Sequence, residues 1–339
     1  MQLATVSLHG TTFERGQQHG ARFRHKIEAA VGDLKSAHGE PGYRRAAQLA
    51  RDTWPDIQAQ VPAAAAELEG ISAGARLAVI DTLLLSGFEF FDGAGTMGCS
   101  AVAASGPNGA LVAQNWDAAP SAAEALALFL HFGANGFEQA VVGAVGGLGW
   151  VGCNRHGLAF VNNDLVLSST GSGLPSQLVR RAILEATSVA AAIDRLKAIR
   201  HRAGRSYLLG DATGAVAGVE VSARIGARIN QAESPVLHTN HALDTSIRSD
   251  EDEAALLATY PSSRHRLARL RDRLPLAITV PALAALLANR DGFPNAIAKA
   301  ASAEEPTATL FSVIFDCRGR SLHLCAGAPS DNAYQQVAW

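Results

Sequence analysis

Residues 96–117 read TMGCSAVAASGPNGALVAQNWD, and this stretch decides which fold and which chemistry the sequence predicts. Cys99 follows a glycine in mid-chain and begins a short apolar run. A Gly-Pro-Asn-Gly turn at 106–109 then leads to a second apolar run that ends in Asn-Trp-Asp. This pattern predicts an antiparallel hairpin in which Cys99 lies opposite Trp116 or Asp117, depending on the register. Directly opposed side chains lie about 5 Å apart, so a thiol and a carboxylate can become neighbours through local geometry alone.

An ordinary hairpin with a polar end explains neither Gly98 nor a nucleophile at the first residue of a strand. Cleavage of the Gly98–Cys99 peptide bond would explain both. Glycine tolerates strained backbone angles and leaves its carbonyl unshielded, so the Cys99 thiol could attack that carbonyl and form a thioester. Water would then release Cys99 as a new N-terminus. Its α-amine, with an unperturbed pKa of about 8, could serve as the base for its own thiol.

The composition is that of a folded protein with ordinary charge. Of the 339 residues, 48% are hydrophobic and 18% are charged, and the net charge is −2. No basic run could follow a phosphate backbone, so nucleic acid is not an expected partner. The longest apolar stretches contain acids and fall short of a membrane span, and the N-terminus lacks the pattern of a secretory signal. We therefore expect a cytoplasmic enzyme or binding protein with no membrane partner.

The order of the predicted elements favours sheets in contact with layers of helices. Residues 12–91 have mostly helical patterns, with Thr12 as the first cap, and strand-like runs follow from Cys99. A helical pair joined at Ser188 comes next, and strands, helices and strands then alternate to the end of the chain. This order differs from a regular βαβ winding and indicates an α+β fold. Without an internal repeat or a low-complexity linker, residues 1–339 are predicted to form a single domain.

Two other motifs suggest binding sites, but each has a simpler explanation. Gly147, Gly149 and Gly152 match G-x-G-x-x-G, yet a strand rather than a helix is predicted to follow, so no helix N-terminus would face a pyrophosphate. Close approach between strands explains these glycines better. His238 and His241 have no third ligand nearby in sequence, and the four cysteines fit no zinc site or disulfide framework. We therefore expect no metal and no cofactor.

The chain resembles the isopenicillin N acyltransferase (acyl-coenzyme A:6-aminopenicillanate acyltransferase) family of self-cleaving N-terminal-nucleophile (Ntn) hydrolases. The likeness covers nearly the whole chain, and it is carried by the order and spacing of several motifs. These are GTTFERGQQHG at 10–20, MGCS at 97–100, NGALVAQNWD at 108–117, GCNRHGLAFVNND at 152–164, HTNH at 238–241, DGFP at 291–294 and TLFSVIFD at 309–316. The resemblance implies an αββα sandwich, with two stacked antiparallel sheets between helical layers, and a precursor that cuts itself before Cys99.

The resemblance also implies a set of catalytic residues. Cys99 matches the nucleophile, and Asp117 matches the acid that is expected to orient the freed amine and thiol. Asn240 matches an asparagine that is expected to donate a hydrogen bond to the tetrahedral oxyanion, a role that suits a neutral amide. Asn163 and Asn115 are candidates for holding the α-amine or the substrate, although Asn is also common at strand ends and turns.

Two departures from the family pattern bear on the substrate. Ser100 and Ala101 stand where the penicillin enzyme has two threonines, so a hydroxyl near the nucleophile is missing. Lys299 stands where the family enzyme has an arginine after the DGFP motif. Lysine keeps the positive charge and is a candidate for substrate binding or amine orientation, but it lacks the bidentate fork that grips a carboxylate. Penicillin chemistry is therefore not implied, and the family also includes hydrolases of other small amides.

The predicted protein is a self-cleaving cysteine amidohydrolase or acyltransferase that acts on a small N-acyl amine through an acyl-Cys99 thioester. Water would accept the acyl group in hydrolysis and an amine in transfer, and an amine or acyl-coenzyme A could be the co-substrate. Cleavage would leave residues 1–98 as a mainly helical subunit and residues 99–339 as the catalytic subunit, associated as a heterodimer. Two alternatives stay open: an uncleaved cysteine hydrolase with His238 or His241 as its base, and a non-catalytic protein that binds small molecules.

Overall fold

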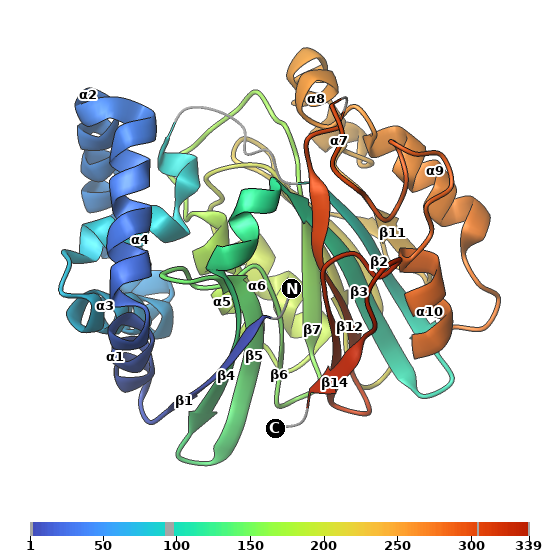
Figure 1. Cartoon of the computed structure of the whole chain (residues 1–339), viewed down its shortest axis with the longest axis horizontal. Helices are drawn as coiled ribbons and strands as arrows, with labels where there is room; N and C mark the ends of the chain where they lie inside the picture. The colour runs from blue at the N-terminus through green and yellow to red at the C-terminus, as the bar shows by residue number, and fades with distance from the viewer. Residues whose placement is uncertain (1–2, 92–97, 304, 338–339) are drawn as a thin grey trace.

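Two β-sheets stack face to face and carry helices on both outer faces (Figure 1). The computed structural model describes residues 3–91, 98–303 and 305–337, so Thr96 and Met97 of the cysteine motif lie outside the described residues. The first sheet has eight strands, in the spatial order β1 (Ala4–His9), β4 (Leu126–Gly133), β5 (Gly136–Ala144), β6 (Val151–Asn154), β7 (Ala159–Asp164), β8 (Arg205–Gly210), β9 (Val216–Ser222) and β10 (Gly226–Gln231). The second sheet has six, in the order β11 (Val236–His238), β2 (Gly98–Gly106), β3 (Gly109–Ala118), β12 (Ala308–Asp316), β13 (Ser321–Ala326) and β14 (Gln335–Val337).

The helices form two separate layers, one on each sheet. The layer on the first sheet contains α1 (Thr12–Arg22), α2 (Arg24–Gln60), α3 (Pro62–Ala75), α4 (Val79–Ser86), α5 (Ser176–Leu184) and α6 (Val189–Ala198). The layer on the second sheet is built mainly from α9 (Ser263–Arg273) and α10 (Val280–Leu287), and the short helices α7 (Thr245–Arg248) and α8 (Glu253–Thr259) precede them. Two 3₁₀ turns, η1 (Phe88–Phe90) and η2 (Pro120–Ala125), flank the hairpin of β2 and β3 in sequence.

Alternation of side chains along the strands produces the layers. In β4, Leu128 and Leu130 belong to the core between the sheets, whereas Phe129 packs with the helices of the first layer. In β2, Ala101 faces the first sheet, and Val102 packs with the residues of α9 and α10. The predicted αββα sandwich is therefore confirmed. The prediction that both sheets are antiparallel was wrong in one detail, because β1 pairs with β4 in parallel. The connection between these two strands is long enough to allow parallel pairing.

The hairpin of β2 and β3 has the turn that the sequence predicts, at residues 107–108 between Gly106 and Gly109. Its register sets Cys99 opposite Trp116 and Gly98 opposite Asp117. Neighbouring residues of a strand point to opposite faces, so the Cys99 side chain enters the core between the sheets. Asp117 lies with Gly98 on the other face, toward the helical layer of the second sheet. The thiol and the carboxylate are therefore separated by the thickness of one strand.

Helix caps and close-packed glycines explain several other patterns in the sequence. Ser188 lies between α5 and α6, as predicted, and is the N-cap of α6. The cap of α1 is Thr11 rather than the predicted Thr12, because Thr11 and Glu14 form a reciprocal capping box. Gly149 has a φ of +105°, and a Cβ at Gly152 would lie 2.7 Å from the carbonyl oxygen of Ala140. The left-handed backbone conformation therefore explains Gly149, and close backbone approach explains Gly152. In the described part of the chain, no helix is both long enough and apolar enough to cross a membrane.

Candidate active site

The backbone of Cys99 is held on both sides by long-range hydrogen bonds. Its N–H donates to Oδ1 of Asn240 at 3.0 Å. Its carbonyl oxygen accepts one hydrogen bond from Nδ2 of Asn163 at 3.2 Å and another from Nη1 of Arg266. Because Gly98 and Cys99 begin β2, these three side chains fix the strand at the peptide bond where cleavage is predicted.

Arg266 is the site residue that the sequence analysis missed. It lies on α9, is fully buried, and donates from Nη2 to Oδ1 of Asn240 at 2.7 Å and from Nη1 to Oγ of Ser100 at 3.0 Å. A signal for its burial was available, because Arg266 occupies the same helix face as Leu267 and Leu270, which are buried. It is one of several arginines in SSRHRLARLRDR, so its residue type alone does not distinguish it.

Asp117 lies against Gly98 on the face of the sheet opposite the thiol. Its Oδ1 accepts a hydrogen bond from Oγ1 of Thr309 at 2.7 Å, and its Oδ2 is buried with no hydrogen-bond partner among the described residues. A Cβ placed on Gly98 would lie 3.3 Å from this Oδ2 and 3.5 Å from Nζ of Lys299. Lys299 in turn donates to Oε2 of Glu305 at 2.7 Å. A carboxylate and an ammonium group therefore flank Gly98.

Burial dominates the electrostatics of these groups. Burial raises the pKa of the Cys99 thiol, the Asp117 carboxylate adds to this shift, and Arg266 opposes it. Burial also raises the pKa of Asp117, against the effects of Lys299 and Arg266. The Lys299 pKa is lowered by burial and by the charge of Arg266. In the uncleaved chain the thiol is consequently protonated at neutral pH, and it needs a base before it can act as a nucleophile.

The two asparagines proposed for amine or substrate binding occupy different environments. Asn163 contacts Cys99 directly, as described above. Asn115 lies opposite Ser100 in the hairpin and donates from Nδ2 to the carbonyl oxygens of Leu287 and Ile297, at 2.8 and 3.0 Å. These bonds tie β3 to the end of α10 and to the segment before Lys299. The structure therefore brings Asn163 to the nucleophile, whereas the contacts of Asn115 are those of an anchor between layers.

The two histidines of HTNH have partners other than the thiol. His238 is fully buried, with Nε2 2.8 Å from Oε1 of Glu220 and Nδ1 2.7 Å from the carbonyl oxygen of Thr239. In His241, Nδ1 lies 2.8 Å from Oγ of Ser263, and burial lowers its pKa to about 3, with the charge of His238 adding to the shift. Across the described ranges, no group of three or more His, Cys, Asp or Glu side chains is placed to hold a metal ion.

The Cys99 side chain lines a cavity of about 20 Å³, which is room for one water molecule. Trp116 stacks on Trp150 there, with their ring centroids 4.3 Å apart. The lining residues are Phe88, Cys99, Trp116, Trp150, Asn162, Asp164, Arg180 and Arg205. Phe88 precedes the predicted cleavage site, and so does Glu89, whose Oε1 accepts a hydrogen bond from Arg205 at 2.9 Å. Residues from both sides of that site therefore build the surroundings of the thiol.

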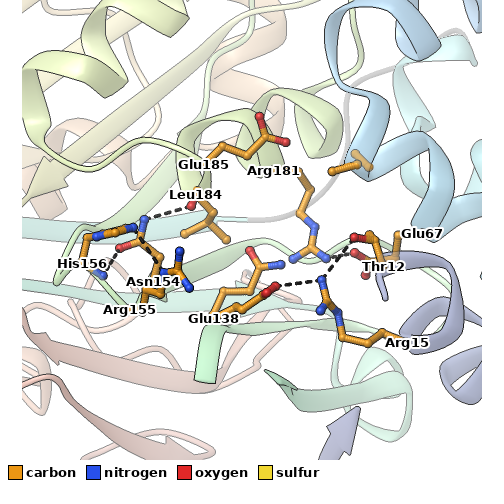
Figure 2. A pocket seen from close by; sticks show the side chains of 13 residues that line it. Thr12, Arg15, Glu67, Glu138, Asn154, Arg155, His156, Arg181, Leu184 and Glu185 are labelled. Atoms are coloured by element: carbon orange, nitrogen blue, oxygen red, sulfur yellow. Dashed lines mark hydrogen bonds and ion pairs between the residues drawn. The ribbon is translucent and has the colours of Figure 1, made fainter. Parts of the chain in front are cut away.

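A larger cavity, of about 270 Å³, lies away from the thiol, between α1, α3 and α5 and the strands β5 and β6 (Figure 2). Figure 2 shows the side chain of Arg15 extending toward Glu138 and that of Arg181 extending toward Glu67. Arg15 pairs with Glu138 at 2.9 Å, and Arg181 pairs with Glu67. Because its buried charges neutralise one another and no predicted catalytic residue lines it, this cavity is a polar junction between helices and sheet.

The chain has sequence relatives among known proteins. Residues 104–331 match the family model for acyl-coenzyme A:6-aminopenicillanic acid acyl-transferase. The chain is 29% identical over 338 residues to the acyl-coenzyme A:6-aminopenicillanic-acid-acyltransferase 40 kDa form of Emericella nidulans, and the match covers 96% of this chain and 93% of that protein.

Two solved structures show a weaker likeness. A Caenorhabditis elegans N-acylethanolamine-hydrolyzing acid amidase ortholog has a TM-score of 0.43 at 12% identity, covering 65% of this chain and 93% of its own. Penicillin V acylase from Agrobacterium tumefaciens has a TM-score of 0.40 at 13% identity, covering 67% of this chain and 82% of its own.

Proposed function

Because the chain belongs to the acyl-coenzyme A:6-aminopenicillanic acid acyl-transferase family, we propose that it is a self-cleaving cysteine amidohydrolase or acyltransferase. One observation carries the proposal. The Gly98–Cys99 peptide bond begins β2 with Asp117 and Lys299 beside Gly98, while side chains from three other segments bind the backbone of Cys99. An ordinary strand end has no need of so many buried polar partners.

Self-cleavage would begin with attack of Cys99 Sγ on the carbonyl carbon of Gly98. The new C–S bond replaces the C–N bond, and the thiol proton ends on the Cys99 nitrogen, which leaves as an amine. Water then hydrolyses the thioester and gives a carboxylate at Gly98 and a free thiol at Cys99. Asp117 would then orient the freed amine, because its Oδ2 lies beside Gly98 and has no hydrogen-bond partner among the described residues.

Turnover would use the same groups. Oδ1 of Asn240 now accepts from the Cys99 N–H, and it could accept from the freed amine in the same position. That amine takes the thiol proton as Sγ attacks a substrate amide, and then gives it to the departing amine. Nδ2 of Asn240 donates to the carbonyl oxygen of Asp164 at 3.3 Å, a long hydrogen bond that a developing oxyanion could replace. The acyl group stays on Cys99 until water or an acceptor amine removes it.

The contacts around the thiol favour this mechanism over the two alternatives. An uncleaved hydrolase would need His238 or His241 beside Cys99, and the hydrogen bonds described for both rings lead elsewhere. A non-catalytic binding protein would have no need of the buried polar side chains that bind the backbone of Cys99. In our proposal, cleavage before Cys99 comes first and makes room for the substrate.

The intact mass of the purified protein tests the proposal. We expect two pieces of 98 and 241 residues, which together make up the 339 of the chain. The Cys99→Ala variant should remain a single chain, and Cys153→Ala, which removes another buried free thiol, should still be cut. Hydroxylamine added during turnover of small N-acyl amines should divert the acyl group to a hydroxamate. An active protein with a single intact mass would contradict self-cleavage, and an acyl adduct on any other cysteine would contradict the assigned nucleophile.

A further inference from the structure

Arg180 places a buried guanidinium group at the wall of the nucleophile's cavity. It lies on α5, is 4% exposed, and lines the same cavity as Cys99 and the Trp116–Trp150 stack. Its charge acts on the thiol, since Arg180 opposes the rise in the pKa of Cys99. Arg180 is therefore close enough to contact a group attached to Cys99.

The donors of this guanidinium group are poorly satisfied. Nη1 donates to the carbonyl oxygen of Gly149 at 3.4 Å, and Nη2 donates to Oγ of Ser176 at 3.2 Å, both long distances for hydrogen bonds. Nε is buried with no hydrogen-bond partner among the described residues. The other close neighbour is the neutral hydroxyl of Tyr207. A guanidinium group has five N–H donors, so the Nε–H and part of the remaining capacity are unused even when the hydrogen bond to the Tyr207 hydroxyl is counted.

Two neighbouring arginines with similar burial have carboxylate partners. Arg181, the next residue, pairs with Glu67, and Arg205, on the same cavity wall, pairs with both Glu89 and Asp164. Within residues 3–91, 98–303 and 305–337, no carboxylate oxygen lies in ion-pair contact with Arg180. The carboxylates whose charges act on Arg180 are those of Glu89 and Asp164, and both are bound to Arg205. Burial raises the pKa of Asp164. A buried cation without a partner is costly unless a ligand supplies the negative charge.

We infer that Arg180 is a specificity residue that binds a carboxylate of the substrate, so that the preferred substrates are small amides bearing a carboxylate near the scissile bond. This inference rests on the proposed amide chemistry at Cys99. Guanidinium and carboxylate groups match in bidentate geometry, and the flat Trp116–Trp150 stack would lie against the apolar part of the same ligand. The carboxylate could be carried by the acyl half or by the amine half of the amide.

Matched pairs of substrates separate the two halves. N-succinyl-para-nitroaniline and N-butyryl-para-nitroaniline differ by a carboxylate on the acyl half. N-butyryl-para-aminobenzoate and N-butyryl-para-toluidine differ by a carboxylate on the amine half. In one pair, the wild-type protein should favour the anionic member by about 10- to 100-fold in kcat/KM, the effect of one charge-assisted hydrogen-bonded contact.

Arg180→Gln should remove that preference, mainly through KM, because it should lower kcat/KM for the anionic member far more than for the neutral member. Arg180→Lys should keep part of the preference, because it keeps the charge. Arg200→Gln, at an exposed ion pair, is the control for loss of an arginine. Thermal melting and the extent of self-cleavage show whether each variant is folded and processed.

The outcomes distinguish this inference from the proposed function. A wild-type protein that cleaves both members of each pair equally well overturns the role of Arg180 and leaves the amide chemistry intact. Arg180→Gln lowering anionic and neutral turnover equally would show a structural role and also overturns it. If no amide is cleaved, calorimetric titration of the same pairs decides. Tighter binding of an anionic member that is lost in Arg180→Gln supports the inference while the proposed reaction fails, and equal binding overturns both.

Discussion

Asn240 offers the sharpest test of the catalytic assignment, because its two side-chain atoms have separable roles. Its oxygen accepts hydrogen bonds from the Cys99 N–H at 3.0 Å and from Arg266 at 2.7 Å, and its nitrogen donates to the carbonyl oxygen of Asp164 at 3.3 Å. Asn240→Asp keeps an acceptor for Cys99 and Arg266 but removes the donor. Asn240→Ala removes both functions at nearly the same position.

The expected magnitudes follow from these contacts. Loss of an oxyanion donor costs about 3 kcal/mol of transition-state stabilisation, or roughly a hundredfold or more in kcat, and this should appear in both variants. Asn240→Ala also leaves two buried donors, on Cys99 and Arg266, without their acceptor, at about 1–3 kcal/mol each. Its free energy of unfolding should therefore fall more than that of Asn240→Asp, in which a carboxylate can pair with Arg266.

The assay measures kcat per mole of processed Cys99 N-terminus, counted by mass, so that slow self-cleavage is not mistaken for slow turnover. Asn154→Asp is the matched control. This buried asparagine lies in the larger cavity and donates to the carbonyl oxygens of Leu184 and Ala186, so the variant should lose stability but keep its kcat. Normal turnover in Asn240→Asp would refute the donor role, and normal turnover in Asn240→Ala would refute any catalytic role for this side chain.

Three further perturbations test the assembly, the pH response and the cleavage site. Glu67 and Arg181 pair between the two proposed pieces, so Glu67→Gln leaves the buried Arg181 without its carboxylate at a cost of about 3–5 kcal/mol. The two pieces should then separate at a lower urea concentration on a sizing column. Glu40→Gln, which breaks an exposed ion pair, should leave the elution profile unchanged. Burial lowers the pKa of His19 to about 3, with Arg181 adding to the shift, so between pH 6.5 and 3 the unfolded chain binds a proton that the folded chain does not. Stability should thus fall on acidification by up to about 1.4 kcal/mol per pH unit for this group, and His19→Gln in the uncleaved Cys99→Ala chain should flatten the pH dependence of unfolding. Gly98→Val places a branched side chain against Asp117 and should slow the appearance of the two pieces over time, and cleavage at the normal rate would show that this contact is unimportant.

The sequence was a good guide to the hairpin but not to its register. The Gly-Pro-Asn-Gly turn predicts two antiparallel strands, and the structure has them. A shift of one residue would have put Asp117 opposite Cys99 and turned every side chain of one strand to the other face. The observed register sets Trp116 opposite Cys99 and also depends on β12, which pairs with the other edge of β3. The paired residues Asp117 and Thr309 are 192 positions apart in sequence.

Long-range contacts account for what the sequence did not reveal. Arg266 reaches the carbonyl oxygen of Cys99 across 167 residues of sequence, and a local arginine-rich helix pattern gives no sign of such a contact. The parallel pairing of β1 with β4 is likewise set by where the helices between them pack. The motif resemblance pointed to Asn240 and Asn163, and the side chains of both contact the backbone of Cys99.

The placement of Glu89 and β1 before the proposed cleavage point has a practical consequence for producing the protein. A shortened gene that starts at Cys99 would supply the nucleophile with a free amine and avoid self-cleavage altogether. Its product would lack β1, however, and would leave β4 as an open edge that invites aggregation. It would also leave Arg205 with one carboxylate fewer beside the thiol. Co-expression of residues 1–98 from a second gene is therefore the route by which a cleavage-independent form should be recovered in its folded state.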